Sequence, residues 1–140
     1  MTSATTNGAG IARPLAAALA FGRIGIGLSV WAIPRGSMRV LGFDPDNPEV
    51  MALARLAGTR DLALGAGAAA TLDDPAAAAT MLRVNAAVDA GDALAFGIAL
   101  LRRRGIDRAA LVGTVTAAGA AAVALAVAKR VESDATRAQI

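Results

Sequence analysis

The sequence contains no cysteine, no histidine and no tyrosine. These absences exclude disulfides, thiol nucleophiles, imidazole acid–base catalysis and zinc-finger-type metal sites. Aromatic side chains are scarce as well, with only Phe21, Trp31, Phe43 and Phe96 in 140 residues. Because so many catalytic side chains are missing, we do not expect an enzyme, and we expect no metal and no cofactor.

Small and apolar residues are abundant instead. The chain has 38 Ala and 15 Gly, together 53 of its 140 residues, and 56% of its residues are hydrophobic. A soluble domain fills its core with large side chains, whereas helices in lipid use small residues to approach one another closely. The composition therefore predicts an all-α integral membrane protein. The alternative, a soluble alanine-rich bundle, would be released by carbonate extraction of membranes.

The charged residues favour a membrane rather than a nucleic acid as the partner. The formal net charge is +3, but no basic helix face carries the interleaved aromatic residues that stack on bases. The densest basic cluster, residues 102–104 with Arg108, borders an apolar run, as is typical of a cytoplasmic membrane flank. No basic region precedes the first apolar run, so we expect no cleaved signal peptide. We expect a multi-pass protein of the bacterial inner (plasma) membrane, in contact with the lipid bilayer.

Four apolar runs have the length of membrane spans, at residues 15–33, 48–72, 75–104 and 108–129. Asn47, Asp74 and Asp107 precede three of them as helix N-caps, and Gly105 follows the third as a C-cap. The links after the second and third runs are short, which predicts an up-down-up-down bundle of four transmembrane helices. Residues 1–14 are then a disordered N-terminal segment, 15–130 the transmembrane domain and 131–140 a flexible C-terminal tail.

The first link, residues 34–47, is longer than the others. Its apolar residues alternate with Arg35 and Arg39, which fits either an interfacial turn of helix or an ordinary loop with buried anchors. Within it, the sequence 44–47 (DPDN) reads as a turn with a helix cap, because it lacks the distal acidic ligand of a calcium loop. The arginines flanking the four runs favour a topology with both termini outside the cytoplasm.

Charged residues lie near the midpoints of the first three runs. Each would cost roughly 2.5–3.5 kcal/mol if it were unpaired at the centre of a membrane helix, so we expect them to pair. On the third run, Asn85, Asp89 and Asp92 share one face of a helix with Phe96. Three arginines balance three aspartates. We predict an intramembrane network joining the first three helices, made by Arg23, Arg55, Arg60, Asp61, Asn85, Asp89 and Asp92.

Glycines near these charges are predicted to let the helices pack closely. The predicted packing positions are Gly22, Gly25, Gly58 and Gly65. Arg83 points away from the aspartate face and is expected to extend toward a membrane surface. The fourth run carries no charge from residue 109 to 128, and we expect it to pack through Ala and Gly against the bundle or against a partner.

Two roles for the charged network remain open. It could fix helix register, because a wrong pairing would leave a charge unmatched in lipid. It could instead form an ion path or a pocket for a polar head group. The first role is favoured, since arginine does not release protons at accessible pH and no carboxylate is left over in the predicted pairing. Proton flux abolished by Asp89→Asn would favour the second.

The segments 55–65 (RLAGTRDLALG) and 89–92 (DAGD), together with Gly22-Arg23, resemble a known family. They are similar to small four-helix membrane proteins of actinobacteria that are classified as a domain of unknown function. The resemblance covers most of residues 15–125, and it implies that the charged layer is the defining site of the family. The layout is also distantly similar to DoxX-type membrane proteins.

We therefore expect a small membrane protein that serves as a non-catalytic accessory or assembly subunit of a larger membrane complex. Its partners would be other membrane subunits or further copies of itself. The alternative is a small transporter, or a carrier of a lipophilic ligand such as a lipid or quinone, that uses the Arg–Asp network.

Overall fold

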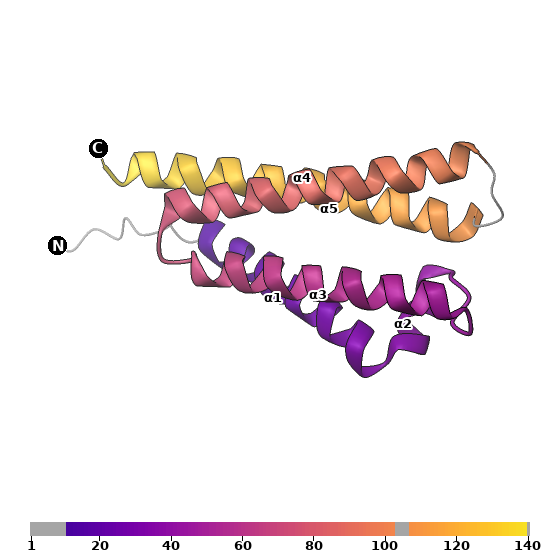
Figure 1. Ribbon diagram of the computed structural model, residues 1–140. Coiled ribbons are helices and arrows are strands. Elements are labelled where there is room, and N and C mark those ends of the chain that lie inside the picture. The colour runs from indigo at the N-terminus through magenta and orange to yellow at the C-terminus, as the bar shows by residue number, and fades with distance from the viewer. Residues whose placement is uncertain (1–10, 103–106, 140) are drawn as a thin grey trace.

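In the computed structural model, residues 11–102 and 107–139 are described, and all their regular structure is helical (Figure 1). The prediction of an all-α fold is therefore confirmed. Four helices are long and one is short. They are α1 (Ala12–Ala32), α2 (Pro34–Leu41), α3 (Pro48–Ala70), α4 (Pro75–Leu101) and α5 (Asp107–Arg137).

The long helices pack as two antiparallel pairs. Contacts are extensive between α1 and α3 and between α4 and α5, but sparse between the two pairs. Figure 1 shows the pairs close together near the chain ends and diverging toward α2. The fold is thus two helix pairs and the short helix α2, and the up-down-up-down bundle of four transmembrane helices predicted from the short links is not confirmed. Short links fix the order of neighbours but not the closeness of their packing.

Glycines bring the backbones of α1 and α3 together. A Cβ atom added at Gly27 would lie 2.6 Å from the carbonyl oxygen of Gly58, and one added at Gly65 would lie 2.8 Å from that of Ala20. Of the predicted packing glycines, Gly58 and Gly65 lie in this interface. The other two, Gly22 and Gly25, do not, because a Cβ at either position would meet no atom within 4 Å.

Two small cores lie at opposite ends of the molecule. The core near the chain termini joins both pairs and consists of Ala12, Ala16, Ala78, Ala79, Leu82, Val127, Ala128 and Val131. The core near α2 belongs to α1, α2 and α3 and contains Val30, Met38 and Ala54. The first core therefore holds the pairs together at one end only.

Helix caps form where the sequence indicated them. The side chain of Asn47 accepts hydrogen bonds from the backbone N–H groups of Glu49 and Val50, and Asp74 does the same at the start of α4. The predicted cap at Gly105 and the side chain of Asp107 lie outside the described residues. The link 34–47 contains a full helix, α2, which ends at Gly42 in the left-handed conformation (φ 87°).

The C-terminal segment is more ordered than expected. Helix α5 continues to Arg137, so residues 131–137 are helical and not a flexible tail. Val131 is buried in the core near the termini, and Glu132 pairs with Arg83 of α4 (Oε1 to Nη2, 2.5 Å). Arg83 is thus held by a partner on α5. At the other end of the chain, α1 already begins at Ala12, inside the predicted disordered segment.

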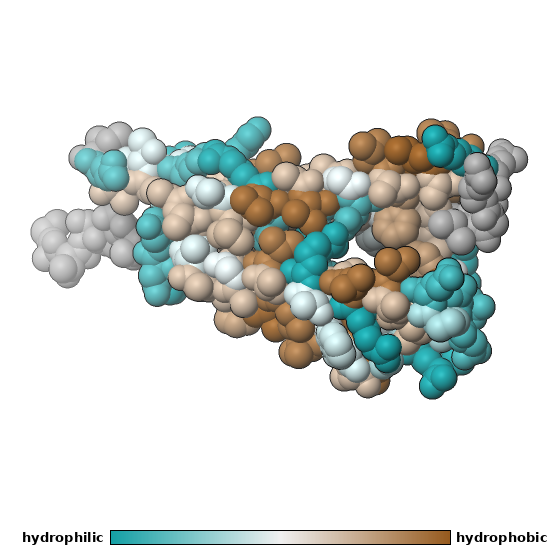
Figure 2. All heavy atoms as spheres, in the orientation of Figure 1, coloured by the Kyte–Doolittle hydropathy of each residue, from teal (hydrophilic) through white to brown (hydrophobic). Residues whose placement is uncertain are grey.

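Among the described residues, three helices are long and apolar enough to cross a membrane: α1, α4 and residues 108–137 of α5. Helix α3 is long enough but less apolar, because it carries Arg55, Arg60 and Asp61 in its middle. Figure 2 shows apolar residues over much of one face of the molecule. Large apolar side chains exposed on the surface include Phe21, Ile26, Leu28, Leu53, Leu56 and Leu94. So many exposed large apolar side chains fit a surface that contacts lipid or another protein.

Candidate functional site

A cavity of about 620 Å³ lies between the two helix pairs and is lined by residues of all five helices. The hollow is visible between the pairs in Figure 2. Part of its lining is polar, and the rest is apolar. The polar lining side chains, besides Thr116, are Arg23, Arg60, Asp61, Asn85, Asp89 and Asp92. The structure therefore brings together six of the seven residues of the predicted network.

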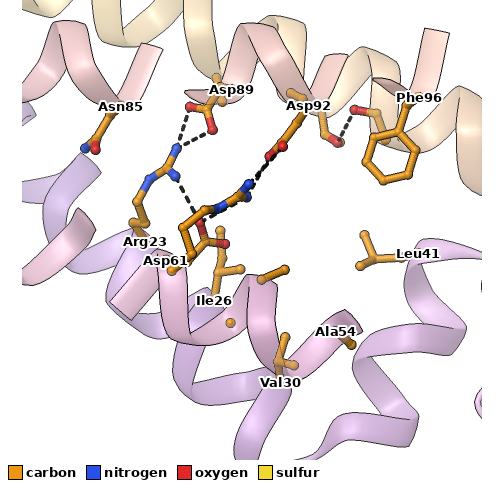
Figure 3. A pocket seen from close by; sticks show the side chains of 18 of the residues that line it. Arg23, Ile26, Val30, Leu41, Ala54, Asp61, Asn85, Asp89, Asp92 and Phe96 are labelled. Atoms are coloured by element: carbon orange, nitrogen blue, oxygen red, sulfur yellow. Dashed lines mark hydrogen bonds and ion pairs between the residues drawn. The ribbon is translucent and has the colours of Figure 1, made fainter. Parts of the chain in front are cut away.

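Arg23, near the middle of α1, connects the two pairs. Its Nη1 donates to Oδ1 of Asp61 on α3 at 3.0 Å, and its Nη2 donates to both carboxylate oxygens of Asp89 on α4 (Figure 3). The side chains of Arg23 and Asp89 are only 13% and 9% exposed. One guanidinium thus pairs with two carboxylates in a buried position, where the loss of a partner would strongly destabilise the fold.

Arg60 forms a second connection between the pairs. Its Nη1 and Nη2 donate to the two carboxylate oxygens of Asp92 on α4, at 2.9 and 2.6 Å. This two-point geometry is the strong form of an arginine–carboxylate pair. The same guanidinium lies 3.6 Å from Asp61. Asp61 is therefore shared between both arginines.

Arg55 is the residue of the predicted network that lies elsewhere. Its guanidinium lies over the ring of Trp31, 6.0 Å from the ring centroid, and its side chain is exposed. The reason is the helix repeat, because five residues along a helix rotate a side chain by about 140° from Arg60. The cavity therefore holds two guanidiniums and three carboxylates, and the balance of charge expected from the sequence was wrong.

Asn85 lies one turn before Asp89 on the same face of α4, and it is 3% exposed. In Figure 3 its amide lies on the far side of Arg23 from Asp92. Its Oδ1 is buried and has no hydrogen-bond partner among the described residues. Buried polar atoms are almost always paired in native structures, so this oxygen and the Nε of Arg60, which is also buried and has no partner among the described residues, are exceptions in the wall of the cavity.

The apolar part of the cavity was not anticipated. The rings of Phe43 and Phe96 approach each other there with centroids 6.1 Å apart, and Phe96 lies against Gly113 of α5. Leu41 of α2 lines the same region. The signals in the sequence were the apolar residues of the link and the position of Phe96 on the helix face that carries Asp89 and Asp92. They indicated buried anchors but not which helices would meet there.

The remaining predicted features are ordinary. The backbone N–H of Asp46 donates to Oδ1 of Asp44 at 3.0 Å, as in a turn, and Arg35 lies 3.6 Å from Asp46. In the described parts of the chain, no group of three acidic, His or Cys side chains is placed to hold a metal ion.

No known protein family, curated protein or solved structure matches the chain.

Proposed function

We propose that the chain is a four-span protein of the bacterial inner membrane that binds a lipophilic molecule in the cavity between its helix pairs. Helices α1, α4 and α5 have the length and apolar character of membrane spans. Helix α3 lies along α1, and its Arg60 and Asp61 point toward partners on α4 and α1. These pairings lower the penalty for placing α3 in lipid as well.

The observation that carries this proposal is the divided lining of the cavity. Its volume of about 620 Å³ lies within the range of about 300–1,000 Å³ typical of ligand pockets. An apolar region near Phe96 faces a cluster of charged and amide groups. A molecule with a hydrocarbon body and a polar head matches both regions at once. The proposal therefore favours the alternative role weighed for the sequence, a carrier or transporter of a lipophilic ligand.

The charged network also has a structural role, but that role alone does not explain the cavity. The pairs Arg23–Asp89 and Arg60–Asp92 both cross from one helix pair to the other. If they served only to fix register, small residues next to them could pack to close the space, as they do between α1 and α3. The long arginine side chains instead bridge two pairs that diverge around a cavity.

The test is to purify the protein in a mild detergent and to identify co-purified lipophilic molecules by mass spectrometry. Ala120 of α5 lines the cavity, whereas Ala122, also exposed, does not. Ala120→Phe should fill part of the cavity and reduce the co-purified ligand at least fivefold relative to Ala122→Phe. Equal recovery of the same molecules from both variants would place the ligand outside the cavity and overturn the proposal.

A second candidate is an accessory or assembly subunit of a larger membrane complex. It is supported by exposed small residues on α5, including Gly119, Ala122 and Ala126, which would let a partner helix approach closely. Size exclusion of the detergent-solubilised protein from its native membrane tests this role. Stoichiometric foreign subunits in one large peak would support it, and a small peak holding only this chain would exclude it. The resemblance to the actinobacterial four-helix family fits either role.

A further inference from the structure

We propose that an anionic phospholipid binds with its phosphate between Arg35 and Arg55, in a surface pocket at the α2 end of the molecule. The chain termini lie at the opposite end (Figure 1). The pocket shares no lining residue with the cavity between the helix pairs, so its ligand is distinct from the molecule proposed for that cavity.

The pocket lies between the start of α2, the turn at residues 45–46 and the first two turns of α3, and its volume is about 310 Å³. Arg35 lines it from α2 and Arg55 from α3. Three of the five prolines of the chain, Pro34, Pro45 and Pro48, form part of its wall. Because proline fixes the backbone φ angle, this wall is stiff and holds the two helix starts in a fixed arrangement.

Positive charge predominates in the pocket. Its charged lining residues are Arg35, Arg55 and Asp46. The Nε of Arg35 lies 3.6 Å from Oδ1 of Asp46, which is too far for a hydrogen bond, and both side chains are mostly exposed. Arg55 pairs with no carboxylate among the described side chains. A phosphodiester has one negative charge, so it balances this set, and its oxygens match the paired N–H donors of a guanidinium.

The N-terminus of α2 adds to the attraction for an anion. Helix α2 begins at Pro34, and no described side chain caps its start with a hydrogen bond. The first N–H groups of a helix have no partner within the helix, and the helix dipole places partial positive charge there. The start of α3, in contrast, is already capped by Asn47. An anion in the pocket therefore meets two guanidiniums and an uncapped helix start.

The position of the pocket favours a lipid over a free phosphate. Helix α1 has the length and apolar character of a membrane span, and it ends at Ala32, just before α2. Trp31 in its last turn is 52% exposed, and the guanidinium of Arg55 lies over its ring. Tryptophan is enriched at the level of lipid head groups. Leu28, one turn deeper, is 54% exposed, so a lipid with its phosphate at Arg55 can lay its chains along α1.

An anionic head group fits the pocket better than a zwitterionic one. The amine of a zwitterionic phospholipid would add a positive charge beside Arg35 and Arg55. In the topology predicted from the flanking arginines, with both termini outside the cytoplasm, the α2 end faces the cytoplasmic leaflet. The surface potential of that leaflet is negative because of its anionic lipids.

The experiment offers two phospholipids with the same dioleoyl chains to the full-length protein in detergent. Phosphatidylglycerol has an anionic head group, and phosphatidylcholine has a zwitterionic one. Native mass spectrometry of an equimolar mixture counts the bound molecules of each. Since one arginine near a membrane surface contributes roughly a fivefold preference for anionic lipid, we expect a ratio of bound phosphatidylglycerol to phosphatidylcholine of about five or more. The ratio should fall as the salt concentration rises.

Exposed residues provide the variants and a matched control. Arg35→Gln combined with Arg55→Gln should lower the ratio below about two. Lys129→Gln combined with Arg130→Gln removes the same charge from α5 nearer the chain termini, and should leave the ratio unchanged. Asp46→Asn removes the competing carboxylate and should raise the ratio. If the first double variant does not fold, Arg35→Gln alone and Asp46→Asn must still shift the ratio in opposite directions.

Three results would overturn the site. Equal binding of the two lipids would show that the pocket does not select an anionic head group. Equal loss of the ratio in the two double variants would mean that only the total charge of the protein attracts the lipid. A large excess of glycerol phosphate should leave most of the phosphatidylglycerol bound, and its displacement would mean that the pocket binds free phosphate. The test of the cavity with Ala120→Phe is independent of all three.

Discussion

The contact within the α1–α3 pair and the contact between the two helix pairs are built in opposite ways. Between α1 and α3, Gly27, Gly58 and Gly65 remove side chains so that one backbone touches the other. Between the pairs, Arg23 and Arg60 extend long side chains across a space to reach aspartates on α4. The first contact leaves no room for a ligand, and the second surrounds a cavity.

The difference shows how an alanine- and glycine-rich chain can be both tightly packed and hollow. Small residues stabilise helix pairs through close van der Waals contact, which loses about a quarter to a half of its attraction over a gap of about 0.5–1 Å. An arginine–carboxylate pair can join two helices whose backbones lie further apart, because the long side chain spans the distance and only the charged groups must fit together. Substitutions in the two contacts should therefore differ in size and in sensitivity to shape, and the following predictions are ordered by expected effect.

Arg23→Met should have the largest effect, because it leaves Asp61 and Asp89 without their main partner in a buried site. We expect a loss of about 3–5 kcal/mol in the free energy of unfolding, measured in mixed micelles with increasing SDS. The matched control is Arg55→Met, which removes an exposed arginine over Trp31 and should cost about 1 kcal/mol or less. Equal losses in the two variants would mean that Arg55 belongs to the network after all.

Gly65→Ala tests the contact within the pair. Its added Cβ would lie 2.8 Å from a backbone oxygen of α1, so α1 and α3 must move apart, at a cost of about 1–3 kcal/mol by the same assay. Gly25→Ala makes the same chemical change in open space. It should be neutral or stabilise by up to about 1 kcal/mol through helix propensity. A stabilising Gly65→Ala would contradict the close contact of α1 and α3 at this glycine.

Glu132→Gln tests the part of α5 that replaces the predicted tail. The pair with Arg83 is about half exposed at both ends, so its loss should cost no more than about 1 kcal/mol. Hydrogen exchange should nevertheless show residues 131–137 protected in both proteins, because Val131 remains buried. Rapid exchange of residues 131–137 in the unaltered protein would instead support the prediction of a flexible C-terminal tail.

Arg13→Gln should have the smallest effect. Arg13 and Asp73 lie 2.5 Å apart, but their side chains are 68% and 90% exposed. Solvent screens such a pair, and we expect a change within about 0.5 kcal/mol. If Arg13→Gln lowered the free energy of unfolding as much as Arg23→Met does, exposed ion pairs would contribute as much to stability as the buried network.

The charged face of α4 could be read from the sequence because it depends on one helix alone. Positions 85, 89 and 92 fall on one side of any regular helix, and an apolar run cannot leave such residues in lipid without partners. The caps at Asn47 and Asp74 were equally local. Arg55 was wrongly assigned to the charged network. The sequence shows how many charges there are, but only the packed helices decide which of them meet.

The sequence by itself thus determined the four long helices, most of their ends, and the fact that the buried charges must meet. These follow from hydrogen bonding, helix repeat and the cost of unpaired charge, all of which act over a few residues or within one helix. Only the tertiary structure decided that the helices form two pairs, that Gly27 and not Gly22 makes the close contact, and that a cavity with an excess carboxylate lies between the pairs. These features depend on how far apart two surfaces settle, and that distance is set by the packing of residues distant in the chain.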